Sequence, residues 1–300
     1  MNKILNFDLI YKKCHEDIHH QQQQQHQQQS RLSNQDAADA KCQAESIRII
    51  HMDKCQISTI CPDALSGFVY LQVLSLRDNN ISFIDASTFR DCALLQELWL
   101  SGNLLTFIDP SMLQHLKKLK KLWLDNNRIK SIEPNTFDSL FHLKELWLAN
   151  NLISHVNQNT FQLLVNLEEL HLNDNQIRSL DVNAFTGLTN LREMNLYGNK
   201  ISVLEQYVFA PLVNLQEFYF YNNKNYSIDA RLFKHMSNLL VAELFIEATN
   251  NIREIHNILV SSINFLHQIK TLIICIQQQK RAHFELLFNI YLYIKSPVLD

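Results

Sequence analysis

Aromatic side chains that could bind a partner recur along this chain at one spacing. All three tryptophans are 24 residues apart, and a histidine stands at the next such position. Large aromatic rings dominate the binding energy of many protein interfaces, because they bury a wide and rigid surface. The spacing therefore predicts one binding surface. Its candidate residues are Trp99, Trp123, Trp147, His171, Tyr197, Tyr219 and Tyr221.

A stripe of glutamates runs two residues before the tryptophan column, and Lys121 interrupts it once. Carboxylates beside aromatic rings would suit a protein or peptide partner that offers basic and apolar groups. The same residues also have a purely structural interpretation, in which the rings cover a sheet and the acids keep its face solvated. The candidate acidic residues are Glu97, Glu145, Glu169, Glu193 and Glu217.

Catalytic and cofactor-dependent chemistry has no comparable pattern. The chain contains neither H-E-x-x-H nor G-x-S-x-G, and His171 has no candidate nucleophile near it in the sequence. The four glycines, Gly67, Gly102, Gly187 and Gly198, are too far apart for a dinucleotide fingerprint or a phosphate loop. A net charge of −3 argues against a nucleic-acid partner. We therefore expect no enzyme, no metal site and no cofactor.

The elements that position these residues come from a 24-residue repeat, which runs without insertion over residues 71–238. Each copy follows L-x-x-L-x-L-x-x-N-x-L-x-x-L-x-x-x-x-F-x-x-L-x-x, with conservative exchanges. L-x-x-L-x-L ends in alternation, which predicts a short strand with Leu inward and the x positions outward. One such strand cannot bury its apolar face, but stacked copies form a parallel sheet along a solenoid. The copies begin at Leu71, Leu95, Leu119, Leu143, Leu167, Leu191 and Leu215.

The aromatic and acidic columns are the fifth and third positions of this repeat. Neighbouring strands lie about 4.8 Å apart, so the rings of the fifth column should stack on one another. Over positions two, three, five, seven and eight, the seven copies carry nine acidic and five basic residues, so the strand face should be acidic. The ninth position is always asparagine: Asn79, Asn103, Asn127, Asn151, Asn175, Asn199 and Asn223.

The repeat resembles the leucine-rich repeat family. Its 24-residue form with Phe at position nineteen is similar to the typical class in Toll-like receptors, Slit and related extracellular proteins, over residues 47–252. The resemblance implies an α/β solenoid, a horseshoe with a parallel concave sheet and an irregular or short-helical convex side. It also implies that the ninth-position asparagines point inward, bond backbone groups of their own and the next coil, and make the turns that Gly would otherwise make.

We expect four segments along the chain. Residues 1–40 are a disordered Gln/His-rich tail, because their composition cannot bury enough apolar surface to order them. Residues 41–70 are an N-terminal cap and a degenerate first repeat, and residues 71–238 are the seven repeats. Residues 239–300 are a degenerate repeat and a C-terminal cap, in which residues 269–274 could form a last strand between helical pieces.

Cysteines and glycosylation sequons indicate whether the protein is extracellular or intracellular. Extracellular members of the family often shield their first coil with a disulfide-bonded cap, and the resemblance implies a disulfide between Cys42 and Cys55. Buried free thiols are the alternative. Asn80 and Asn225 are candidate glycosylation sites.

Together these patterns predict a module for protein–protein recognition through its concave face. The resemblance implies an extracellular or cell-surface place and a receptor-like or innate-immune role. No secretory signal is visible among the first residues, and no apolar run is long enough for a transmembrane helix. An intracellular scaffold and an extracellular matrix or adhesion component are therefore the alternatives.

Overall fold

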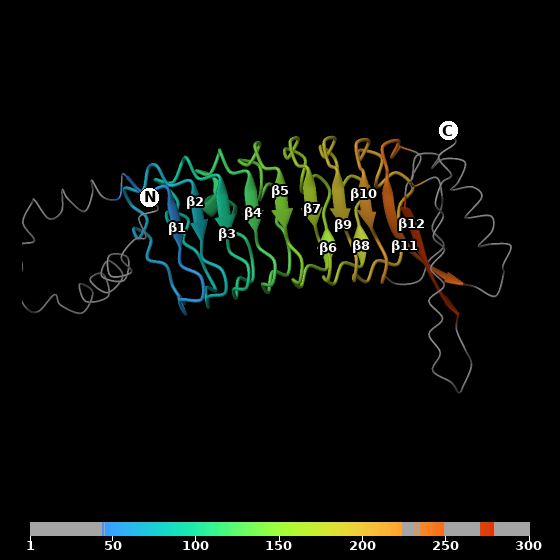
Figure 1. The fold of residues 1–300 in the computed structure, drawn as a ribbon, viewed down its shortest axis with the longest axis horizontal. Coiled ribbons are helices and arrows are strands. Elements are labelled where there is room, and N and C mark those ends of the chain that lie inside the picture. Colours follow the sequence, from blue (N-terminus) through green and yellow to red (C-terminus); the bar gives the residue numbers. More distant parts are fainter. Residues whose placement is uncertain (1–43, 45, 224–231, 233–234, 249–270, 279–300) are drawn as a thin grey trace, which may run out of the picture.

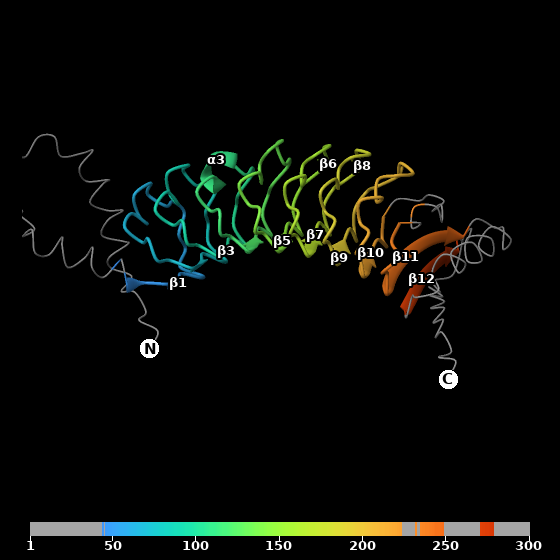
Figure 2. The same ribbon diagram turned by 90° about the horizontal axis from the view of Figure 1, so that it is seen from above.

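The computed structural model describes residue 44, residues 46–223, residue 232, residues 235–248 and residues 271–278. These residues form a curved solenoid of stacked coils, with one strand from each coil in a continuous row (Figure 1). Seen from above, the row of strands follows the inner edge of the arc, and the connecting loops follow the outer edge (Figure 2). The predicted leucine-rich repeat horseshoe with a concave parallel sheet is thus confirmed.

Ten of the described strands form one sheet, and every neighbouring pair in it is parallel. The register advances by one repeat at each step, so Ile49 pairs with Val73 and Val73 pairs with Glu97. Only the last step is longer, because Val241 pairs with Thr271. In sheet order the strands are β1 Ile49–His51, β2 Val73–Ser75, β3 Glu97–Trp99, β4 Lys121–Trp123, β5 Glu145–Trp147, β7 Glu169–His171, β9 Glu193–Asn195, β10 Glu217–Tyr219, β11 Val241–Ala248 and β12 Thr271–Gln278.

The outer side of the arc carries short elements (Figure 2). Helix α3, Pro110–Leu113, begins where Asp109 accepts a hydrogen bond from the Ser111 amide and Pro110 presets the first turn. A two-stranded parallel sheet joins β6, His155–Val156, to β8, Ser179–Leu180. This matches the predicted irregular or short-helical convex side.

The interior is one continuous hydrophobic core between the strand row and the outer loops. Each short strand buries its central residue and turns its neighbours outward, as Leu98 does between Glu97 and Trp99. The nineteenth position forms a second buried column, in which successive rings stack. The ring centroids are 6.0 Å apart for Phe137 and Phe161, 6.3 Å for Phe161 and Phe185, and 5.8 Å for Phe185 and Phe209.

The ninth-position asparagines lie inside the coils and bond to the backbone. Asn103 is representative: its Nδ2 donates to the carbonyls of Leu100 in its own coil and Leu76 in the preceding coil, at 3.0 and 2.9 Å. Its Oδ1 accepts from the Ile81 amide of the preceding coil at 3.0 Å. Outside its own coil, Asn103 therefore bonds the preceding coil and not, as the resemblance had implied, the next one.

The turn itself is made one residue earlier than the sequence predicted. The eighth position has positive φ in every one of the seven copies, whereas the ninth position does not. Only Gly, Asn and Asp adopt this left-handed conformation readily, which explains why so few glycines suffice. At Gly102 an added Cβ would collide with Asp78 Oδ1 of the preceding coil, so the Asp78 side chain would have to shift. The eighth-position residues are Asp78, Gly102, Asn126, Asn150, Asp174, Gly198 and Asn222.

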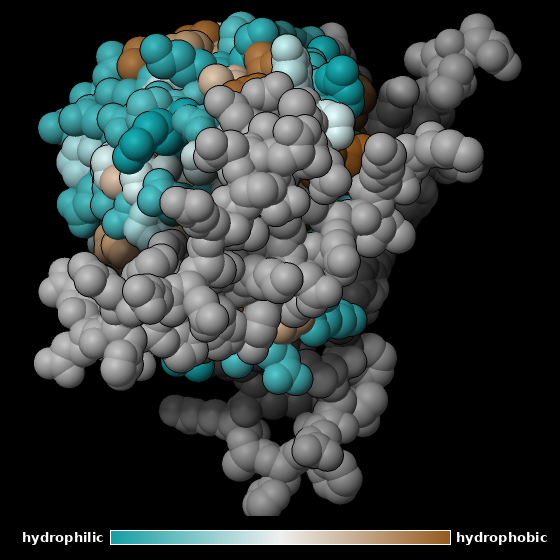
Figure 3. Space-filling model, turned by 90° about the vertical axis from the view of Figure 1, so that its left-hand side faces the viewer, coloured by the Kyte–Doolittle hydropathy of each residue, from teal (hydrophilic) through white to brown (hydrophobic). Residues whose placement is uncertain are grey.

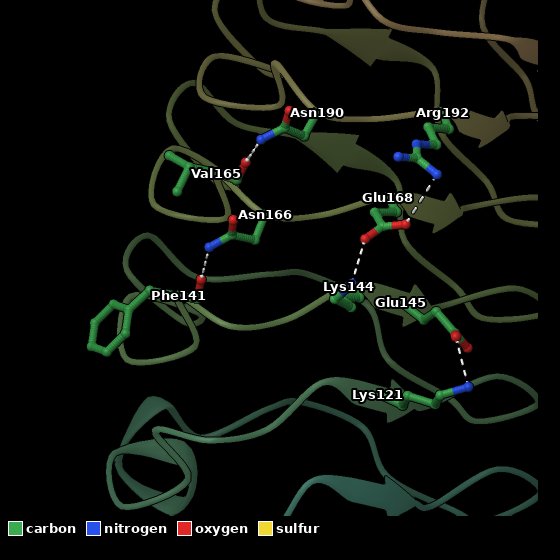
Figure 4. Close-up of polar contacts among 9 residues, drawn as sticks. All are labelled: Lys121, Phe141, Lys144, Glu145, Val165, Asn166, Glu168, Asn190 and Arg192. Carbon is green, nitrogen blue, oxygen red and sulfur yellow. Dashed lines mark hydrogen bonds and ion pairs between the residues drawn. The ribbon is translucent and has the colours of Figure 1, made fainter.

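A second asparagine column, which the sequence analysis missed, ties the coils together on the turn before each strand. The side chain at position twenty-four donates to a backbone carbonyl of the preceding coil. Figure 4 shows two of these bonds, from Asn166 to Phe141 at 2.6 Å and from Asn190 to Val165 at 2.8 Å. Asn214 and Asn238 repeat the contact. The signal in the sequence was the recurrence of Asn in four consecutive copies.

Several expectations concern the ends of the array. Strands β11 and β12 lie in the expected C-terminal segment, and β12 contains Leu272 and Ile274 of the suggested last strand. The tail, the expected helical pieces of the C-terminal segment, Cys42 and Asn225 lie outside the described residues. No helix in the described part of the chain is long and apolar enough to cross a membrane.

The N-terminal end of the solenoid carries Cys55 and Asn80. The Cys55 thiol is free in the structure, and its Sγ lies 3.3 Å from the Asp53 carbonyl, so the disulfide to Cys42 remains a prediction. Asn80 is exposed. Viewed from this end, the described surface is largely hydrophilic with scattered apolar residues (Figure 3).

Candidate binding surface on the concave face

The fifth-position residues form a continuous row of rings across the concave sheet. The register pairs Trp99 with Trp123, Trp123 with Trp147, and Trp147 with His171, so each ring faces the next. Trp99 and Trp123 are stacked with centroids 4.8 Å apart, and Trp147 and His171 are stacked at 3.9 Å. Trp123 and Trp147 are tilted by 45° at 5.5 Å, so the predicted stack is interrupted there. We refer to these four residues as the ring row.

The three tryptophans of the ring row are half-buried, and His171 is buried. The indole Nε1 atoms of Trp99, Trp123 and Trp147 are shielded, and none has a hydrogen-bond partner among the described residues. Arg77 lies 5.7 Å from the rings of both Trp99 and Trp123, within the range of cation–π attraction. His51 contacts Trp99 edge-on at 5.9 Å. Arg77 and His51 extend this surface toward the first coil.

The sequence did not single out Arg77 or His51, although a signal was present. Both occupy outward-facing positions of the repeat, seven for Arg77 in the coil before Trp99 and five for His51 one coil earlier. His51 belongs to the degenerate first repeat, in which the pattern is weaker than in the seven regular copies.

The third-position stripe is acidic, and its one lysine is already paired. Lys121 Nζ lies 2.7 Å from Glu145 Oε1, and this hydrogen bond raises the pKa of Lys121 (Figure 4). Beside it, at position two, Lys144 bonds Glu168 at 2.7 Å and lowers the pKa of that carboxyl. The stripe therefore keeps unpaired negative charge on the side of β7 and β9.

Two glutamates of the stripe sit where ionisation is disfavoured. Burial is the main cause that raises the pKa of Glu169, and the charge of Glu145 adds to it. Burial followed by the charges of Glu217 and Glu169 raises the pKa of Glu193. Glu217 itself accepts a hydrogen bond from the Tyr219 hydroxyl at 2.7 Å.

His171 lies at the end of the ring row and beside these acids. Burial lowers its pKa to about 4, although Glu145 and Asp125 oppose the shift, so the ring is neutral at pH 7. Its Nε2 lies 3.8 Å from both Glu169 and Glu193. The sequence contained no metal-binding motif, but these three residues bring one ligand atom each within 4.8 Å of one another. A linear motif could not reveal this cluster, because its members come from two adjacent coils.

The tyrosines complete the surface at its C-terminal end. Tyr197 and Tyr221, at the seventh position of adjacent coils, have ring centroids 4.3 Å apart. Tyr219 lies in β10 at the fifth position. The structure thus places the predicted aromatic and acidic residues in neighbouring columns of one sheet.

The sequence matches a known family, and the fold is similar to that of a solved structure. The chain matches the sequence model of a family described as Leucine rich repeat over residues 45–105, 70–129, 117–177 and 165–224, together more than half of the chain. No curated protein matches the sequence. A solved structure titled as the octameric complex of Latrophilin 3 (Lec, Olf), Unc5D (Ig, Ig2, TSP1) and FLRT2 (LRR) has a similar fold, with a TM-score of 0.53 and 27% identity. The similarity covers 66% of this chain and 69% of that chain.

Proposed function

Because the chain belongs to the leucine-rich repeat family, we propose that it is a binding module that recognises a protein or peptide through its concave face. The ring row carries the proposal. Three adjacent indole N–H groups without a partner are unusual in a purely structural surface, because buried donors are almost always paired. A ligand with apolar groups would cover the exposed parts of the three rings and bury them further.

The charge of the same face supports a partner with basic groups. The stripe carries five carboxylates against Lys121, and Lys121 is already bonded to Glu145. A lysine or arginine of the partner would gain both a carboxylate and an adjacent aromatic ring. The apolar groups of the same partner would cover the exposed faces of the tryptophans.

Replacing two tryptophans together tests this proposal. Random peptides displayed on phage are selected on the wild-type protein, and the affinity of the selected peptides is then measured on the double variant Trp99→Ala and Trp123→Ala. We expect at least about a thirtyfold loss, since interface hot spots contribute 2 kcal/mol or more. The matched control is Phe83→Ala with Phe107→Ala, two exposed rings 6.3 Å apart that lie outside the ring row.

The two outcomes of this experiment are distinct. If the tryptophan variant is folded and binds the peptides as tightly as wild type, the ring row is only structural and the proposal fails. If the phenylalanine control also loses binding, the ligand site is not on the concave face.

We further propose an extracellular, receptor-like setting for the module, including an innate-immune role. Two observations support it. The similar solved structure contains FLRT2 (LRR) in a complex with Latrophilin 3 and Unc5D. Asn80, in the sequon Asn80-Ile81-Ser82, is exposed and so accessible to a glycosyltransferase.

Glycan analysis of the full-length protein, expressed in cells of its source, checks the setting. We expect a glycosidase-sensitive form whose mass falls when Asn80→Gln is introduced, because N-glycans are added only in the secretory pathway. Ser82→Ala destroys the same sequon and should give the same result. A cell-retained protein without glycan would contradict the extracellular setting and favour the intracellular scaffold.

A further inference from the structure

Glu169, His171 and Glu193 converge on one point of the concave face. Glu169 and His171 are two residues apart on β7, so both side chains leave the same face of the sheet. Glu193 on β9 pairs in register with Glu169 and brings the third side chain beside them. The three ligand atoms lie within 4.8 Å of one another, and His171 Nε2 is 3.8 Å from a carboxylate oxygen of each glutamate.

The nitrogen at the centre of this cluster is buried and unsatisfied. The His171 side chain is only 7% exposed, and its Nε2 has no hydrogen-bond partner among the described residues. Stacking on Trp147 at 3.9 Å holds the ring in place. Its contacts to the two glutamates, at 3.8 Å each, are too long for hydrogen bonds. A buried polar atom left without a partner is costly, so the site is incomplete without a further group.

The charges around the cluster favour a cation as that group. Glu169 and Glu193 are half-buried and adjacent in the sheet, with Glu145 and Glu217 on either side of them in the same column. The flanking acids already have partners, since Glu145 is bonded to Lys121 and Glu217 accepts from Tyr219. A positive charge between Glu169 and Glu193 would relieve their repulsion without displacing an existing contact.

We propose that Glu169, His171 and Glu193 bind a divalent metal ion of the zinc type, through His171 Nε2 and one oxygen of each glutamate. A neutral imidazole with two carboxylates suits Zn²⁺, whereas Mg²⁺ and Ca²⁺ prefer oxygen ligands alone. Zn–N and Zn–O bonds of about 2.0–2.2 Å place tetrahedral ligands roughly 3.3 Å apart. The two 3.8 Å separations from His171 Nε2 are close to this value, and the three ligand atoms, which lie within 4.8 Å of one another, would have to draw together around the ion. The site does not depend on a protein partner.

Metal-dependent thermal stability of the full-length protein tests the site. Protein stripped with EDTA is titrated with ZnCl₂ or MgCl₂ while its unfolding midpoint is followed. An ion that binds only the folded state raises the midpoint in proportion to its affinity. We expect a rise with ZnCl₂ and none with MgCl₂.

Two ligand variants and two controls sharpen the result. His171→Asn and Glu193→Gln should weaken the apparent affinity for zinc by more than about tenfold, the loss seen even for groups that only orient a ligand. Both should fold, because Asn195 already occupies the position of His171 in the next coil and Gln keeps the shape of Glu. Glu97→Gln removes a carboxylate from the same column three coils away and should keep the wild-type response.

The second control removes His19, His20 and His26 of the N-terminal tail, which could bind zinc by themselves. Their joint replacement by Ala should leave the midpoint shift unchanged. The proposal is overturned if wild-type protein shows no zinc response, if either ligand variant responds like wild type, or if the tail variant loses the response.

Discussion

At the scale of single residues, burial decides which side chains can react or bind. Cys92 is fully buried, whereas Cys55 is half-buried with its thiol near the surface turn. Burial is the main cause that raises the pKa of Cys92 to about 12, and the charge of Asp91 adds to it. Cys92 therefore acts as a packing residue of the core and not as a reactive thiol.

The resulting prediction concerns alkylation. In reduced native protein at pH 8, iodoacetamide should label Cys55 readily and Cys92 roughly a thousandfold more slowly than an ordinary thiol, because the thiolate is the reactive form. Raising the pH to 9 or 10 should still leave Cys92 almost unmodified, since its pKa lies higher. Peptide mapping by mass spectrometry measures both sites. Labelling of Cys92 at the rate of Cys55 without unfolding would contradict the prediction.

At the scale of the coil, the turn after each strand depends on the eighth and ninth positions of the repeat. The eighth residue adopts the left-handed conformation, and the ninth-position Asn bonds the backbone groups that the turn leaves unpaired. The asparagine at position twenty-four performs the same bonding on the opposite turn. The four strands that follow Asn166, Asn190, Asn214 and Asn238 therefore have an asparagine bond to the preceding coil on the turn before them, in addition to the ninth-position bonds.

Removing one ninth-position side chain should be costly. Asn103→Ala leaves the buried Ile81 amide without a side-chain partner, whereas the Leu76 carbonyl keeps its bond from Asn79 Nδ2. At roughly 1–3 kcal/mol for one unpaired buried group, we expect the free energy of unfolding to fall by about 2 kcal/mol. Urea unfolding of unglycosylated protein measures it. Asn80→Ala, an exposed asparagine of the preceding coil, should change it by less than about 0.5 kcal/mol.

The eighth position gives a second prediction at this scale. Asn126 is exposed and has φ of 56°, so Asn126→Val forces a β-branched residue into a left-handed conformation. We expect a loss of about 1–2 kcal/mol of stability. Asn126→Gly should be close to neutral, because glycine adopts this conformation without strain. Equal unfolding midpoints for the two variants would show that the backbone conformation is not the cause.

At the scale of the whole molecule, the continuity of the core links distant coils. The buried cluster extends from Ala44 to Leu239 without a boundary, and the stacked phenylalanines pass through its middle coils. Within the repeats, the backbone of each strand pairs only with the strands of the neighbouring coils, so cooperativity passes mainly through these interfaces. The tryptophans all lie in β3, β4 and β5, so their fluorescence reports one part of the array.

A cavity placed far from the tryptophans tests this coupling. Phe209→Ala removes a buried ring near β10 and should destabilise the fold by about 3–5 kcal/mol. We expect tryptophan fluorescence and circular dichroism to shift together to a lower urea midpoint. The control, Val213→Ala, changes an exposed residue of the same coil and should shift neither. Fluorescence that stays at the wild-type midpoint would show that the coils unfold independently.

The repeat by itself determined most of the architecture. The strands, the parallel order, the inward leucines and the alignment of the tryptophans all follow from one 24-residue period, because identical coils can stack only in register. The candidate aromatic and acidic residues could be assigned to one face for the same reason.

Only the tertiary structure decided how neighbouring coils meet. The asparagine bonds, the contact of Arg77 with two tryptophans and the cluster around His171 join residues of different coils. The left-handed conformation falls at the eighth residue of the repeat and not at the ninth. Burial also comes only from the tertiary structure, and it shields the indole nitrogens and lowers the pKa of His171, so that the ring is neutral at pH 7. The period places a residue in a column. Its distances to the neighbouring columns and its exposure to water depend on how the side chains pack.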